Sequence, residues 1–234
     1  MTGLREESDL LVPEAQTRVS TLLVGPTDPS LVMVLAHGAG AGMRHAFLES
    51  VAAGLAARGT ATFRYQFPYM ERGGGRPDAP PTLTATVRAA TAAARARFPD
   101  APLIAGGKSL GGRMTSTTAA SAPLPGVRGL AFFGFPLHAP GRPARSRAEH
   151  LARVTVPMLF LQGTRDEFAD LGLLREALAP LGSRATLHLI DGGDHSFKVL
   201  KRSGRTPGEV LDELLDTVDR WARGLQPPQT ERLS

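Results

Sequence analysis

The 234-residue chain contains no cysteine, which excludes disulfide bonds, thiolate nucleophiles and cysteine-ligated zinc or iron–sulfur sites. Long apolar runs are absent too. The longest, GLAFFGFPL at residues 129–137, has the length of a buried strand and falls well short of the roughly 18 residues that a membrane-spanning helix needs. The first ten residues are rich in acidic side chains and lack the basic start and apolar core of a secretory signal. We therefore expect a cytoplasmic protein without a membrane partner.

The basic residues lack the clustering that nucleic-acid binding requires. The formal net charge is +5, but nearly all the basic residues are arginines scattered along the chain. Only residues 197–205, FKVLKRSGR, concentrate them, and no aromatic side chains that could stack on bases alternate with the charges. We therefore expect no nucleic-acid partner.

Apolar runs and amphipathic segments alternate along most of the chain. Seven segments have the composition of strands: residues 17–25, 30–38, 60–67, 102–107, 127–135, 156–163 and 185–191. Five segments between or after them have the apolar spacing of helices: residues 45–59, 82–97, 110–120, 170–182 and 207–224. Near-continuous apolar strands separated by helix-length connections are typical of parallel sheets. The pattern predicts an α/β fold with a mostly parallel central sheet and helices on both faces.

This pattern predicts a single domain over residues 17–224. Residues 1–16 are predicted to be an N-terminal extension and residues 225–234 a frayed C-terminal tail. Residues 68–81 contain too many glycines and prolines for regular structure and are predicted to be a loop.

A glycine-rich turn, AGGKSLGG at residues 105–112, lies between a predicted strand and a predicted helix. Its Gly-Lys-Ser is part of the phosphate-loop pattern, but that pattern requires a glycine five residues before Gly107, where the chain has Pro102. The alternative pattern, G-x-S-x-G, is a tight turn that exposes a nucleophilic serine. Gly107 and Gly111 flank Ser109 at the required positions, so we favour a nucleophile over a phosphate site.

A serine hydroxyl is a good nucleophile only when an imidazole accepts its proton and a carboxylate orients that imidazole. On a sheet of this kind the three groups follow the chain order serine, acid, histidine. Asp166 comes just after the strand 156–163, and His195 just after the strand 185–191. The sequence therefore predicts Ser109, Asp166 and His195 as the catalytic residues.

The rival side chains fit less well. Asp191 and Asp194 are too close in sequence to His195 to approach its ring easily from the far side. Asp170 is expected to cap the helix that follows it. His188 lies inside a predicted strand and is expected to be a core or surface side chain.

Two backbone N–H groups should stabilise the oxyanion that forms during attack by a serine. Leu110, directly after the nucleophile, is predicted to supply one from the start of a helix. The loop HGAGAG should supply the other, from Ala39 or else Gly40. His37 is expected to brace this loop, because a metal site with His45 would lack a third ligand at suitable spacing. We predict no metal.

The ordered motifs resemble those of the α/β-hydrolase superfamily over residues 17–223. The segments that carry the resemblance are LAHGAGAG, FRYQFPYMERGGGRPDAPP, AGGKSLGGRM, GFPLHAPGRP, LFLQGTRDEF and DGGDHSF. They are most similar to the small, cap-less dienelactone-hydrolase-like branch, and in it to bacterial α/β-family hydrolases related to the testis-expressed and chromatin-complex α/β-hydrolase-like proteins of animals. The resemblance implies a single-domain α/β-hydrolase fold with Ser109 as nucleophile, His195 as base and Asp166 as acid.

This chain departs from dienelactone hydrolases at the nucleophile, where they use cysteine, so their substrate is not carried over. Only residues 137–154 separate two of the predicted strands, which leaves a minimal cap and an open site. That segment and residues 64–81 should form the walls. Substrate-lining candidates are Arg64, Tyr65, Tyr69 and His138. In the alternative, Arg64 pairs with a structural acid and the tyrosines pack, and Lys108 is expected to point into a neighbouring loop.

These observations favour a serine hydrolase that cleaves small carboxylic esters or thioesters through an acyl-enzyme, without a metal or organic cofactor. We expect a monomer or a homodimer. The alternative is a catalytically idle α/β-hydrolase-fold protein that acts as a binding or scaffold protein.

Overall fold

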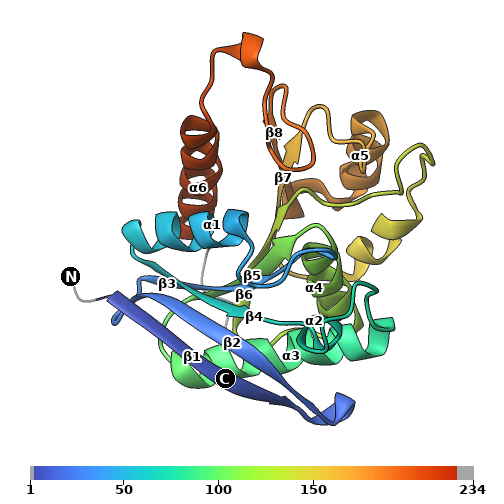
Figure 1. Ribbon diagram of the computed structural model, residues 1–234. Helices are drawn as coiled ribbons and strands as arrows, with labels where there is room; N and C mark the ends of the chain where they lie inside the picture. The colour runs from blue at the N-terminus through green and yellow to red at the C-terminus, as the bar shows by residue number, and fades with distance from the viewer. Residues whose placement is uncertain (1–2, 226–234) are drawn as a thin grey trace, which may run out of the picture.

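A computed structural model describes residues 3–225 as a single domain built on one sheet (Figure 1). The sheet has eight strands in the order β1-β2-β4-β3-β5-β6-β7-β8. Their bounds are β1 Gly3–Val12, β2 Thr17–Pro26, β3 Leu31–Ala36, β4 Thr60–Tyr65, β5 Leu103–Lys108, β6 Val127–Phe133, β7 Met158–Gly163 and β8 Ala185–Ile190. The predicted frayed tail lies outside the described residues from position 226 onward.

The strands from β4 to β8 in this order are parallel. Every residue of β3, β4 and β7 is buried, because helices cover both faces of the sheet. The predicted mostly parallel sheet is confirmed. Its carboxyl edge gathers the loops that follow β3, β5, β7 and β8, and these loops carry the predicted site residues.

Most of the predicted N-terminal extension is part of the sheet. Gly3–Val12 forms the edge strand β1 and pairs antiparallel with β2 along its whole length. Most of its side chains are exposed, so the segment has no apolar alternation that could identify it as a strand. Backbone hydrogen bonds to β2 hold it in the sheet, helped by the packing of Leu4 and Leu10 against the core and by the burial of Val12. Backbone bonds leave no pattern in the sequence.

Helices α1 (Ala46–Ala57) and α6 (Pro207–Arg223) pack on one face of the sheet, and α3 (Pro80–Arg97), α4 (Leu110–Ser121) and α5 (Leu171–Leu178) on the other (Figure 1). The spacing of Val210, Leu214 and Val218 places these side chains in the core on one face of α6. Among residues 3–225, no helix is both long enough and apolar enough to cross a membrane.

Two connections near the carboxyl edge are more ordered than the sequence suggests. The predicted loop 68–81 begins with the short helix α2 (Pro68–Glu71), which Pro68 can start because the first turn of a helix needs no N–H there. The connection between β6 and β7 contains one 3₁₀ helix, Ser146–Arg153. It is too short to form a separate cap domain.

Candidate active site

Ser109 lies in the tight turn between β5 and α4. Its backbone has φ of 50° and ψ of −116°, a conformation that a residue with a Cβ rarely adopts. A Cβ at Gly107 would lie 2.5 Å from the Ala36 carbonyl oxygen, and one at Gly111 would lie 2.6 Å from the His37 carbonyl oxygen. The two glycines are therefore required because the turn packs directly on the end of β3.

The structure brings the three predicted catalytic side chains into one hydrogen-bonded chain. Ser109 Oγ lies 2.9 Å from His195 Nε2, and His195 Nδ1 lies 2.7 Å from Asp166 Oδ2. The Asp166 side chain is fully buried, whereas that of His195 is 20% exposed. The carboxylate is thus shielded from water, while the imidazole can reach a bound molecule.

Gln162, which the sequence analysis did not identify, fixes Asp166. Its Nε2 donates a hydrogen bond to Asp166 Oδ2 at 2.6 Å, and its Oε1 accepts one from the Phe135 N–H at 2.9 Å. The Phe168 N–H donates to Asp166 Oδ1 at 2.8 Å, and the Phe168 ring packs 4.3 Å from the His195 ring. The available signal was an amide side chain near the end of an otherwise apolar buried strand.

Lys108 contacts a neighbouring loop, as the sequence predicts, and this is the loop that carries His195. Its ammonium group donates to the His195 carbonyl oxygen at 2.6 Å and lies 5.5 Å from the centre of the Phe197 ring. Burial lowers the pKa of Lys108 to about 8, an effect that the carboxylates of Asp166 and Asp194 partly oppose. The turn at Ser109 and the loop that carries His195 are thus linked through Lys108.

The loop after β3 is braced from two sides. His37 Nδ1–H donates to the Gly38 carbonyl at 2.8 Å, and its Nε2 accepts the Phe67 N–H at 2.9 Å. Tyr69 donates its hydroxyl hydrogen to the Ala39 carbonyl at 2.7 Å, and burial raises the pKa of Tyr69 to about 12, so it remains a donor at neutral pH. These bonds fix the peptide groups around Ala39.

Two backbone N–H groups near Ser109, those of Leu110 and Ala39, have no hydrogen-bond acceptor among residues 3–225. The Leu110 N–H opens helix α4, and the Ala39 N–H belongs to the braced loop. Their use as an oxyanion hole, with Gly40 as the other candidate, stays a prediction.

Residues 29–223 match the family model described as an alpha/beta hydrolase domain. The chain belongs to the α/β-hydrolase family. The predicted resemblance is thereby confirmed at the level of the family.

Solved structures agree with this fold. A dienelactone hydrolase from Anabaena variabilis is 20% identical, with a TM-score of 0.74 over 94% of this chain and 97% of that one. An α/β serine hydrolase without lid from Xanthomonas campestris is 22% identical, with a TM-score of 0.72 over 98% of both chains. An esterase domain from Rhodothermus marinus is 16% identical, with a TM-score of 0.71 over 94% of this chain and 98% of that one.

A pocket of about 320 Å³ in this α/β-hydrolase is lined by Ser109 and His195. Phe47, Leu48 and Phe168 give it apolar walls. The other lining residues are Gly38, Ala39, Gly40, Ala41, His45, Lys108 and Ser196. The sequence analysis did not identify the wall formed by Phe47 and Leu48 of α1, because apolar residues in an amphipathic helix are ordinarily core positions.

Three of the four substrate-lining candidates, Arg64, Tyr65 and Tyr69, are buried side chains that support the fold, which is the alternative that the sequence left open. Arg64 is fully buried on β4, where it donates to Glu49 Oε1 at 2.8 Å and to the Met43 carbonyl at 2.9 Å. Tyr65 is also fully buried, which raises the pKa of its phenol. Tyr69 supports the Ala39 loop from behind. None of the three lines the pocket. Arg64 and Tyr65 are directed from β4 into the protein, and Tyr69 is buried on α2.

His138, the fourth candidate, is structural as well. It is 5% exposed, its Nδ1–H donates to the Ala139 carbonyl at 2.9 Å, and its Nε2 accepts the Asp170 N–H at 2.8 Å. Asp170 caps α5 by accepting the Leu173 N–H, as predicted. Within residues 3–225, no group of three or more histidine, aspartate or glutamate side chains is arranged to bind a metal ion.

The buried histidines should make the protein sensitive to acid. Burial lowers the pKa of His37 to about 4, and burial together with Arg113 and Arg153 lowers that of His150 to about 4. Since the unfolded chain binds these protons near pH 6.5 and the folded chain does not, stability should fall as the pH decreases from about 6.5 to 4. Each histidine contributes up to about 1.4 kcal/mol per pH unit.

Urea unfolding of the wild type and of His37→Gln at several pH values in this window measures that slope. We expect a shallower decline in the variant. If His37→Gln does not fold, His150→Gln provides the same comparison. Equal slopes in wild type and variant would contradict the assignment.

Proposed function

We propose that this protein is a serine hydrolase that cleaves small carboxylic esters or thioesters through an acyl-enzyme. The observation that carries the proposal is the continuous chain of hydrogen bonds from Asp166 through His195 to Ser109 Oγ. It ends at a pocket whose walls are mainly apolar. Esterases among the solved neighbours support the same class of reaction.

The proposed reaction starts when Ser109 Oγ attacks the ester carbonyl while His195 Nε2 accepts the hydroxyl proton. Asp166 keeps the other imidazole proton on Nδ1 and stabilises the imidazolium that forms. The carbonyl oxygen becomes an oxyanion, which the N–H groups of Leu110 and Ala39 stabilise at the start of α4.

The tetrahedral intermediate then collapses. The carbon–oxygen or carbon–sulfur bond to the leaving group breaks, and His195 transfers the proton to that group. A water molecule attacks the acyl-enzyme with His195 again as the base, which releases the carboxylic acid and regenerates Ser109. This chemistry requires no metal and no organic cofactor.

The direct test is labelling with a fluorophosphonate probe, which reacts with activated serines. We expect one adduct, which peptide mass spectrometry locates at Ser109, and no adduct in protein unfolded before the probe is added. A folded protein that remains unlabelled, and that hydrolyses neither short esters nor thioesters, would favour the idle scaffold instead.

A further inference from the structure

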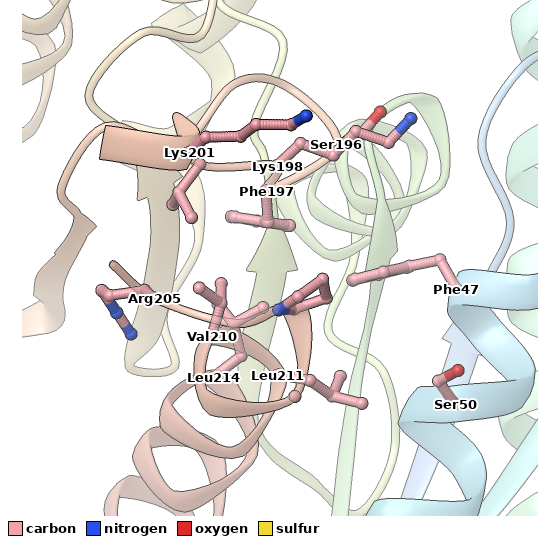
Figure 2. Close-up of a pocket in the computed structure, with 13 residues that line it drawn as sticks. Phe47, Ser50, Ser196, Phe197, Lys198, Lys201, Arg205, Val210, Leu211 and Leu214 are labelled. Atoms are coloured by element: carbon pink, nitrogen blue, oxygen red, sulfur yellow. The ribbon is translucent and has the colours of Figure 1, made fainter. Parts of the chain in front are cut away.

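A second cavity lies beside the active-site pocket and is not used by the proposed chemistry. It has a volume of about 680 Å³ and lies between α1, α6 and the loop that follows His195 (Figure 2). Phe47 and Ser196 line both spaces. The two cavities are therefore neighbours that share a wall.

Apolar side chains from three elements form most of this second cavity. Figure 2 shows Phe47 on α1, with Phe197 on the loop and Val210, Leu211 and Leu214 on α6. The Phe47 and Phe197 rings are stacked with their centres 5.8 Å apart. Such walls favour a hydrocarbon chain, because burying apolar surface is favourable without any directional bond.

The outer rim is cationic. Lys198 and Lys201 line the cavity, and neither forms a salt bridge with a carboxylate among residues 3–225. Arg205, the third basic residue there, is paired with Glu213. Asp194 accepts the backbone N–H groups of Ser196 and Lys198. The two lysines thus leave positive charge beyond the apolar part.

The N-terminus of α6 also borders the cavity, but its backbone N–H groups do not add to the positive charge of the rim. Thr206 and Glu209 form a capping box that occupies the helix terminus. An anion at the rim would therefore meet the lysine side chains.

We propose that this second cavity binds an apolar arm of the substrate whose far end carries a carboxylate. The inference rests on the proposed function, and it names the substrate class: an amphiphilic ester with a reactive carbonyl at Ser109, a hydrocarbon chain that passes Phe47, and an anionic end near Lys198 and Lys201. The arm belongs to the acyl or the alcohol portion, and ester series lengthened on one side at a time distinguish the two.

The test measures binding apart from hydrolysis. Linear carboxylates from butanoate to dodecanoate, below their micelle concentrations, are titrated into Ser109→Ala protein by calorimetry. We expect affinity to rise two- to fourfold per methylene until the cavity is filled. Neutral alcohols of equal length should bind more weakly, and the difference should shrink at high salt.

Two matched pairs of variants, each in the Ser109→Ala background, locate the binding. Ser50→Trp places a ring in the cavity from an exposed position of α1, whereas Ala53→Trp changes an exposed position of the same helix that does not line it. We expect Ser50→Trp to weaken dodecanoate binding at least about tenfold, equivalent to about two methylenes, and Ala53→Trp to match the parent.

The second pair, a double lysine variant and an arginine control, tests whether the positive charge of the rim binds the carboxylate. Lys198→Gln with Lys201→Gln should reduce the preference for the carboxylate over the alcohol by up to about fivefold per lysine. Arg202→Gln, which removes a neighbouring charge that does not line the cavity, should leave that preference at the parent value.

Chain-length-independent affinity, or equal effects of Ser50→Trp and Ala53→Trp, would overturn the proposal. Equal binding of carboxylate and alcohol would overturn its anionic part. Because Ser109→Ala cannot form an acyl-enzyme, these results do not depend on catalysis. If amphiphiles bind as expected while the fluorophosphonate fails to label wild-type protein, the proposed function fails and the binding site stands.

Discussion

Replacing Ser109 by alanine is expected to lower kcat for short esters by about 10⁵- to 10⁶-fold, to the level of the oxyanion donors and binding alone. The reason is geometric: Ser109 Oγ is the hydroxyl within hydrogen-bond distance of His195 Nε2, at 2.9 Å. Initial rates with p-nitrophenyl acetate measure the loss. Ser121→Ala, at an exposed position of the same helix, should retain the wild-type rate.

Strain at Ser109 provides a second readout that does not involve catalysis. The φ of 50° and ψ of −116° penalise any residue with a Cβ, so Ser109→Ala keeps the strain and Ser109→Gly relieves it. We expect the glycine variant to exceed the alanine variant by about 1 kcal/mol in free energy of unfolding. Retained turnover in either variant would contradict the role of Ser109.

Replacing Asp166 by asparagine is expected to lower kcat about 10⁴-fold with little change in KM. Three donors converge on this carboxylate: the Phe168 N–H on Oδ1, and Gln162 Nε2 and His195 Nδ1 on Oδ2. An asparagine that accepts from Phe168 must turn its amide group toward His195. The imidazole would then carry its proton on Nε2, where it can no longer accept one from Ser109.

Reorienting Gln162 would not restore the hydrogen bonds that Asp166→Asn removes. Rotating its amide would give the new asparagine an acceptor, but it would also place an NH₂ group against the Phe135 N–H, to which Gln162 Oε1 is now bonded. We therefore expect Asp166→Asn to fold with reduced stability and to be nearly inactive from pH 6 to 9. Ester kinetics and thermal unfolding measure both effects, and turnover within tenfold of wild type would rule out Asp166 as the acid.

Much of the central fold follows from local pattern. The buried strands are continuous apolar runs, and α6 has a capping box, a proline at its first position and a regular apolar stripe. The edge strand β1 has none of these signals, because its place depends on backbone hydrogen bonds to β2. The short helix α2 was also missed, since glycine and proline dominate the segment around it.

The sequence predicted the three catalytic candidates better than the residues that line the pocket, for a physical reason. Parallel topology brings the ends of β5, β7 and β8 to one edge, so the positions of Ser109, Asp166 and His195 in the chain were enough to predict their meeting. Arg64 on β4 and Tyr69 on α2 are near the same edge of the sheet in the chain, but the direction of each side chain depends on how its strand or helix packs against neighbouring elements. They therefore proved to be supports of the site and do not line the pocket.

The sequence by itself determined the type of sheet, the tight turn at Ser109 and the chain order of the three catalytic candidates, because these depend on residue spacing. Only the tertiary structure decided that Gln162 orients Asp166, that Lys108 holds the His195 loop and that α1 and α6 enclose an apolar cavity beside the Ser109 pocket. Gln162 is only four residues from Asp166, but its other bond is to Phe135 on a separate loop, and the other two features join segments far apart in the chain. These contacts depend on how the helices and loops pack on the finished sheet.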